Sequence, residues 1–181
     1  MGEVIYAPTG AAGPEVLAPP PRFADLGSGG GVPALVLLER WPESQAVLIE
    51  AGARRADFLR QSVEALGWQE RVEVLEERAE VSGRRTDQRA SFALVTARSF
   101  ARPGVTAECA APLLAVGGHL VVSEPPEESD RWTEAGLAEL GMRAGERSDR
   151  SGFHFQLLQQ VELCAARYPR RTGVPERRPL F

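Results

Sequence analysis

Residues 23–33 read FADLGSGGGVP: a short apolar run is followed by a glycine-rich turn and then by a proline. The run predicts a buried strand that ends near Asp25-Leu26, and Pro33 suits the first position of a following helix. Glycines let the backbone turn sharply and leave its N–H groups uncovered, while a helix N-terminus adds partial positive charge. This order of strand, turn and helix predicts a shelf for a cofactor rather than a plain connection.

The spacing of the glycines favours one class of nucleoside cofactor over another. A dinucleotide loop, G-x-G-x-x-G, would have its third glycine at position 32, where the chain has Val32. Asp25, two residues before Gly27, gives D-x-G-x-G instead, which resembles the S-adenosylmethionine loop of Rossmann-like methyltransferases. Glu50 ends the next predicted strand, where a carboxylate can accept hydrogen bonds from ribose hydroxyls. Together with Glu80, these two carboxylates would attract the ammonium and sulfonium of S-adenosylmethionine.

Length and composition predict a single globular domain, because 181 residues with 43% hydrophobic and 25% charged content are ordinary for that class. No apolar run approaches the ~20 residues that cross a bilayer, and the N-terminus lacks the pattern of a secretory signal. Cys109 and Cys164 lie among apolar neighbours and make no disulfide framework. We therefore expect a cytoplasmic monomer with buried thiols, no membrane partner and no metal.

The charge distribution is uneven although the net charge is only −4. All 21 basic residues are arginines, and the segment 165–181 holds five of them against Glu176. That segment carries +4, so the remaining chain carries −8. A basic tail on an acidic body suggests a local anionic partner, and a merely solvated tail stays open as the alternative.

Strand and helix patterns alternate after residue 22, whereas residues 1–22 contain five prolines and predict an irregular arm, in which 3–6 are a possible short strand. We expect an α/β, Rossmann-like class I methyltransferase fold over 23–181, including the basic tail 165–181. Its sheet would be seven-stranded, mostly parallel, and closed by an antiparallel C-terminal hairpin. The expected strands are 23–26, 46–50, 72–75, 91–96, 119–123, 142–147 and 153–164. The expected helices are 33–40, 53–66, 104–114 and 130–140, and Gly117-Gly118 is expected to end the third of them.

Several short pieces together resemble the bacterial 16S ribosomal RNA guanine-N7 methyltransferases, the glucose-inhibited division protein B family. The matching pieces are 25–33 (DLGSGGGVP), 54–61 (RRADFLRQ), 78–80 (RAE), 96–101 (TARSFA) and 167–175 (RYPRRTGVP). The glycine loop alone marks a broad superfamily. The arginine-phenylalanine turn and the arginine-proline tail are more particular to this family, and the resemblance spans about Phe23 to Leu180.

The resemblance implies S-adenosylmethionine as cofactor and 16S ribosomal RNA, or the small ribosomal subunit, as partner. It implies contacts to the methionine part from Gly27 and Val32, to the ribose from Glu50 and Ala51, and to the adenine from Ala79 and Glu80. The full set of expected cofactor-binding residues is Asp25, Gly27, Gly29, Val32, Glu50, Ala51, Ala79, Glu80 and Arg98.

Three arginines would serve the acceptor side. By resemblance, Arg98 lies at the mouth as the catalytic residue and also contacts RNA, and Arg170 and Arg171 contact RNA phosphates beside the cleft. An arginine suits this task because its planar fork binds two phosphate oxygens at once.

Methyl transfer to guanine N7 does not require the catalytic residues that other classes of nucleic-acid methyltransferase need, and this sequence does not show those residues. N7 is nucleophilic and carries no proton, so methyl transfer needs no general base; orientation supplies up to ~7–11 kcal/mol in the best cases. A cytosine-C5 enzyme would need a loop cysteine, yet Cys109 and Cys164 fall in a predicted helix and strand. An amino-group enzyme would carry Asp/Asn-Pro-Pro-aromatic where this chain has Ala97–Phe100.

Three departures from the family keep other functions open, and one of them is the overall acidity of the chain, with a net charge of −4. The arm before residue 23 is shorter than the helical region of the family, and Ser123-Glu124 stands where the family tends to have lysine. One alternative is a methyltransferase that acts on a small metabolite. The other is a cofactor-binding homologue without catalytic activity on RNA.

Overall fold

The computed structural model describes residues 6–8, 14–16, 19–126, 130–150 and 152–181. A seven-stranded sheet has the order β5-β4-β3-β6-β7-β9-β8. Its strands are β3 (Arg22–Leu26), β4 (Gln45–Ile49), β5 (Val72–Leu75), β6 (Phe92–Ala97), β7 (Leu114–Glu124), β8 (Met142–Arg150) and β9 (Phe153–Gln160). The pairs from β5 to β7 are parallel, and β9 pairs antiparallel with both β7 and β8. The predicted fold and its closing hairpin are confirmed.

Alternation along the strands divides the core into two apolar clusters, one on each face of the sheet. In β4, for example, Val47 and Ile49 belong to one cluster, and Leu48 belongs to the other. The Leu48 cluster takes in α1 (Ala34–Arg40) and α2 (Ala53–Ala65). The opposite cluster takes in α3 (Ala79–Ser82), α4 (Pro103–Ala110) and α5 (Glu134–Glu139). Such two-sided cover is what a mostly parallel sheet requires.

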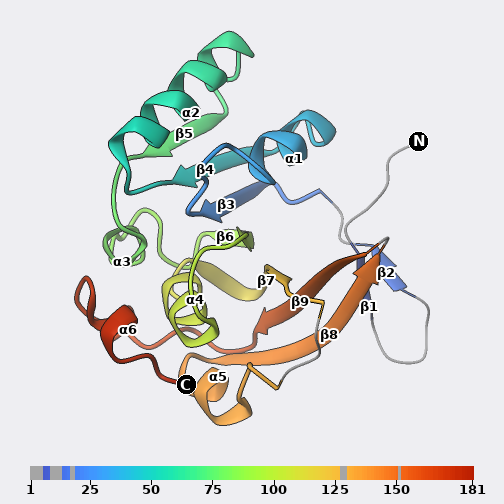
Figure 1. Cartoon of the computed structure of the whole chain (residues 1–181), viewed down its shortest axis with the longest axis vertical. Coiled ribbons are helices and arrows are strands. Elements are labelled where there is room, and N and C mark those ends of the chain that lie inside the picture. Colours follow the sequence, from blue (N-terminus) through green and yellow to red (C-terminus); the bar gives the residue numbers. More distant parts are fainter. Residues whose placement is uncertain (1–5, 9–13, 17–18, 127–129, 151) are drawn as a thin grey trace.

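After β9 the chain packs beside the helices α4 and α5. Figure 1 shows the C-terminal segment, in red, lying beside α4 and α5 and carrying the short helix α6 (Val174–Arg177). No helix was predicted in this segment. Gly173, with φ of +77°, precedes α6, and Pro175 lies in its first turn.

The glycine pair Gly117-Gly118 does not end a helix, and that prediction was wrong. α4 ends at Ala110, and β7 already begins at Leu114. The register of β6 and β7 shifts between Phe92 and Leu94, which marks an irregularity beside the pair. A Cβ at Gly118 would lie 2.9 Å from the carbonyl oxygen of Phe92, so glycine permits close approach of two strands.

Other element bounds differ by a few residues. The helix expected over 130–140 covers only Glu134–Glu139, and the hairpin strands are Met142–Arg150 and Phe153–Gln160. In the proline-rich arm, β1 (Tyr6–Pro8) and β2 (Pro14–Val16) form a small antiparallel pair where irregular chain was expected. Of the possible strand at 3–6, residues 3–5 lie outside the described residues, and the division at residue 22 stays a prediction.

Candidate functional site

A cavity of about 560 Å³ lies where β3 and β4 end and their following loops begin. The carboxyl ends of parallel strands are the usual ligand site of doubly wound sheets. Six of the nine predicted cofactor residues line this cavity: Gly27, Gly29, Glu50, Ala51, Ala79 and Glu80. These six residues are spread over 54 positions of the sequence, and the structure brings them together around one cavity.

Glycine is required at two positions of the turn after β3. Gly27 has φ of +65°, and a Cβ there would lie 2.8 Å from Cδ2 of Phe100. Gly31 has φ of +84°, and a Cβ there would overlap Cδ1 of Leu35. Both values of φ lie in the left-handed region, and both side-chain approaches are too close for any larger residue. Gly27 therefore allows the turn after β3 to pack directly against the ring of Phe100, which follows β6.

Glu50 organises the floor of the cavity. Its Oε2 accepts a hydrogen bond from the Gly29 amide at 3.1 Å, and its Oε1 accepts from the Gly52 amide and from Arg55, both at 2.7 Å. Burial raises the pKa of Glu50, but the bonds from Arg55, Gly52 and Gly29 outweigh burial and hold the pKa below its usual value. An ionised carboxylate on the cavity wall suits the two hydroxyls of a ribose.

Asp25 lies behind the glycine turn rather than in the cavity wall. Its side chain is buried, and its Oδ1 accepts a hydrogen bond from Thr96 Oγ1 at 2.6 Å. Its Oδ2 is buried without a hydrogen-bond partner among the described residues. Burial raises the pKa of Asp25 to about 6, against hydrogen bonds from Thr96 and Ser28. A carboxylate at this depth would act on a cofactor's ammonium group through its charge rather than by a direct hydrogen bond.

Glu80 connects the cavity to the C-terminal strap, by which we mean residues 165–181. Its Oε1 accepts a hydrogen bond from the Gly173 amide at 2.9 Å, and Arg78 Nε lies 3.6 Å from its Oε2. Glu176 of the strap also lines the cavity. Glu80, which was predicted to flank an adenine, therefore also holds the strap in place.

Arg170 is held in a buried ion pair rather than presented to solvent. Glu108 of α4 is fully buried, and its Oε1 accepts hydrogen bonds at 2.8 Å from both the main-chain amide and Nε of Arg170. Nε also lies 3.0 Å from Oε2, and a second guanidinium nitrogen binds the same oxygen. The predicted phosphate contact of Arg170 competes with this pair and stays a prediction. The neighbouring Arg171 is exposed.

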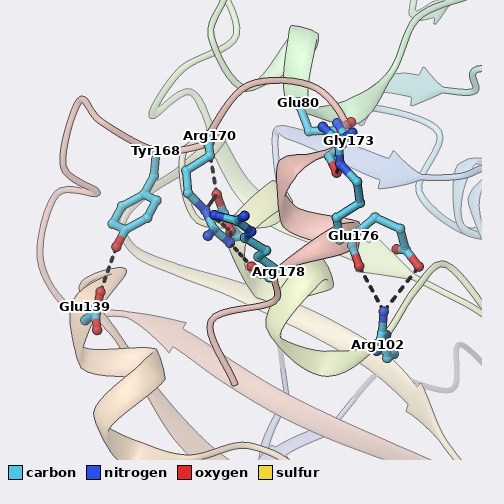
Figure 2. A network of polar contacts seen from close by, with 10 residues as sticks. Glu80, Arg102, Glu139, Tyr168, Arg170, Gly173, Glu176 and Arg178 are labelled. Atoms are coloured by element: carbon cyan, nitrogen blue, oxygen red, sulfur yellow. Dashed lines mark hydrogen bonds and ion pairs between the residues drawn. The ribbon is translucent and has the colours of Figure 1, made fainter.

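Further polar contacts fasten the strap along its length (Figure 2). The Tyr168 hydroxyl donates to Glu139 at 2.7 Å, and Arg102 donates to the carbonyl of Glu176 at 2.9 Å. Sequence reasoning missed these partners and missed Glu108. A single glutamate within the apolar run around Cys109 was the available signal, because a charge in such a run needs a partner.

Two predicted cofactor residues other than Asp25 lie outside the cavity wall. Val32 is 43% exposed, and Arg98 is exposed at the end of β6. Ser99, with φ of +51°, turns the chain so that Phe100 reaches Gly27 while Arg98 does not line the cavity. The positive charge of Arg98 lowers the pKa of Asp25, so the two groups interact electrostatically. Their roles toward cofactor and RNA stay predictions.

The cysteines are confirmed as buried free thiols. Cys109 lines the cavity, and burial raises its pKa far above the usual range; burial raises the pKa of Cys164 to about 11. Neither thiol is activated as a nucleophile at neutral pH. In the described part of the chain, no three metal-ligating side chains cluster, and no helix is both long and apolar enough to span a bilayer.

A second cavity, of about 360 Å³, adjoins the first. The two share Ser99, Phe100 and Ala101, so this segment forms a common wall between them. Glu124 and Trp132 lie on the wall of the second cavity. The geometry thus offers two neighbouring compartments on the same edge of the sheet.

Comparison with known proteins agrees with this arrangement. Two solved structures, a SAM dependent methyltransferase from Aquifex aeolicus and a putative methyltransferase from Thermoplasma acidophilum, superpose with TM-scores of 0.60 and 0.62. The Aquifex aeolicus protein is 15% identical to this chain, and the match covers 78% of this chain and 82% of that protein. The Thermoplasma acidophilum protein is 13% identical, and the match covers 78% of this chain and 68% of that protein. Such likeness establishes the class I methyltransferase fold.

Sequence comparison establishes the family. Proteins named ribosomal RNA small subunit methyltransferase G from Rubrobacter xylanophilus and Chloroflexus aggregans are each 36% identical, over 98% and 89% of this chain and 69% and 70% of their own lengths. The family model described as rRNA small subunit methyltransferase G matches residues 14–137. The chain therefore belongs to the GidB family of rRNA small subunit methyltransferases G.

Proposed function

We propose that the protein transfers the methyl group of S-adenosylmethionine to N7 of a guanine in 16S ribosomal RNA. The observation that carries this proposal is the first cavity, which collects six of the residues expected to bind the cofactor. The two relatives of this chain named above are both called ribosomal RNA small subunit methyltransferase G. The restriction to guanine N7 comes from the resemblance of the sequence motifs to the 16S ribosomal RNA guanine-N7 methyltransferases.

The residues present fit the proposed cofactor. Glu50 would accept hydrogen bonds from the ribose hydroxyls, and Gly27 would let the methionine part approach the backbone closely. Asp25, with its unpartnered oxygen, would supply negative charge toward the ammonium. When bound, S-adenosylmethionine supplies an electrophilic methyl group on its sulfonium.

The protein's own part in the reaction is to position the acceptor. Guanine N7 has a lone pair and no proton, so no side chain has to act as a general base. The segment Ser99–Ala101 separates the two cavities and would set the approach of the purine. Holding N7 in line with the methyl group is the kind of orientation that contributes several kcal/mol, up to about 7–11 in the best cases.

Exposed arginines would attract the RNA backbone. Arg98 and Arg171 are exposed, whereas Arg170 is neutralised by Glu108. The pairing of Arg170 with Glu108 removes one of the arginines expected to bind RNA, and the chain outside residues 165–181 carries a net negative charge. Both facts favour a small acceptor, so methylation of a small metabolite is the second candidate. Deleting the strap would not separate the two candidates, because the strap also completes the cavity wall.

Our proposal includes a monomer in the cytoplasm. Light scattering during size-exclusion chromatography should give the mass of one chain, 19.6 kDa. A stable dimer would contradict this part of the proposal without affecting the chemistry.

The deciding experiment joins binding, transfer and mapping. Calorimetry should first show binding of S-adenosylmethionine to the full chain. Labelled cofactor should then transfer its methyl group to naked 16S RNA or to assembled small subunits, and mapping should locate one N7-methylguanine. Binding without transfer to any form of this RNA would leave the small-metabolite or non-catalytic function. If the full chain does not bind S-adenosylmethionine, every methyltransferase function is excluded.

A further inference from the structure

The second cavity has the size and the walls expected of a pocket for a single base. Its volume of about 360 Å³ lies at the small end of ligand sites, which span about 300–1,000 Å³. Phe100 and Trp132 are among its lining residues. Enzymes that modify a base inside RNA hold it out of its stack between aromatic or apolar side chains, and they bind its Watson–Crick edge by hydrogen bonds.

Glu124 is the buried acid of this cavity. Its side chain is 4% exposed, at the end of β7. Its Oε1 accepts a hydrogen bond from Trp132 Nε1 at 3.2 Å, and its Oε2 accepts from Arg131 at 3.3 Å. These two donors fix the orientation of the carboxylate. A carboxylate has about four lone-pair sites, and the donors among the described residues use two of them.

A carboxylate held in this way suits one purine better than the other. Guanine presents two adjacent donors, N1–H and the 2-amino group, which match the two oxygens of a carboxylate. Adenine presents an unprotonated N1, whose lone pair would face the negative oxygens. N7 lies on the opposite side of the purine from the 2-amino group, so a guanine bound to Glu124 would direct N7 away from it, toward the shared wall at Phe100.

We propose that Glu124 recognises the Watson–Crick edge of the target guanine in the second cavity and thereby selects guanine over adenine. This inference rests on the proposed function and goes beyond it by naming the residue that chooses the base. Ser123-Glu124 is a departure from the family that the sequence resembles, so the selection would be a property of this chain's own acceptor pocket.

The test pairs a change in the protein with a change in the base. Glu124→Gln removes the charge and replaces one acceptor by a donor, while inosine at the mapped target position removes only the 2-amino group. The wild type should prefer guanosine RNA to inosine RNA by about tenfold in kcat/KM, because a lost hydrogen bond to a charged group costs about that factor. Glu124→Gln should lower kcat/KM on guanosine RNA by roughly 10- to 100-fold and should abolish the preference.

Two measurements separate recognition from damage to the fold. Glu124→Gln should bind S-adenosylmethionine within twofold of the wild type, and Glu39→Gln, an exposed change on α1 outside both cavities, should leave every value unchanged. Glu124→Asp keeps the charge but withdraws it by one methylene, and it should retain part of the guanosine preference. Equal guanosine-to-inosine ratios in wild type and Glu124→Gln would overturn the proposal.

A binding experiment covers the case in which no RNA is methylated. With S-adenosylhomocysteine present, guanosine monophosphate should bind the wild type more tightly than adenosine monophosphate or inosine monophosphate does, and Glu124→Gln should lose this order. Absence of any preference in the wild type would overturn the role of Glu124. Preference without methyl transfer would instead support the pocket and contradict the proposed function.

Discussion

Removing the Arg170 side chain should destabilise the protein strongly, because it leaves a charge inside the core. Arg170→Met deletes the guanidinium contacts to Glu108, whose side chain is fully buried, and leaves only the main-chain amide at 2.8 Å. Removing one partner of a buried ion pair costs about 3–5 kcal/mol. The Arg170 side chain is 27% exposed and one bond to Glu108 survives, so we expect about 3 kcal/mol of lost unfolding free energy.

Urea denaturation measures this loss as a shift of the midpoint at constant slope. The double variant Glu108→Met with Arg170→Met should recover about 2 kcal/mol relative to the sum of the single changes, since an apolar pair of similar volume carries no desolvation penalty. Arg171→Met is the matched control, because that neighbour is exposed and should cost less than about 0.5 kcal/mol. A cost below about 1 kcal/mol for Arg170→Met, or strict additivity in the cycle, would refute the reasoning.

Four further changes test the cavity and its surroundings. Because burial raises the pKa of Asp25 from 3.8 to about 6, the folded protein holds this proton where the unfolded chain releases it. Stability should therefore fall by on the order of 2 kcal/mol as the pH rises from about 4 to 6, and Asp25→Asn should remove that fall in denaturation curves while weakening cofactor binding. Glu50→Gln should weaken S-adenosylmethionine binding about 10- to 100-fold by calorimetry, since it loses charged acceptors of the ribose; unchanged affinity would contradict the assigned role. Gly27→Ala should lower the unfolding free energy by about 1–2 kcal/mol and displace Phe100, and an unshifted melting curve would show that the turn tolerates a side chain. Arg171→Gln should leave stability unchanged and reduce the salt dependence of RNA binding by about one phosphate contact, which filter binding across a salt series measures.

The core of the fold could be predicted because its signals are local. Alternation in β4, the proline that opens the helix region after the glycine turn, and the glycine spacing after Asp25 all act within a few residues. The same locality explains why Gly27, Gly29, Glu50 and Ala51 were predicted together: each follows directly from the end of a parallel strand.

The rest depended on contacts between distant residues. Whether Gly117-Gly118 ends a helix or admits a neighbouring strand is decided by Phe92 of β6, which no local pattern reveals. The role of Arg170 is decided by Glu108, 62 residues earlier in the chain. From the sequence alone, a basic tail predicts a surface that binds phosphate. The structure shows that one arginine of this tail, Arg170, is instead paired with a buried carboxylate.

The strap also fixes the order in which the site can be completed during synthesis. Glu80 and Glu108 emerge from the ribosome well before Gly173 and Arg170, which lie 93 and 62 positions later. In a nascent chain that already contains the whole sheet, Glu80 and Glu108 still lack the partners that the strap supplies. Cofactor affinity should accordingly appear as a late step of biogenesis, after the sheet itself has formed.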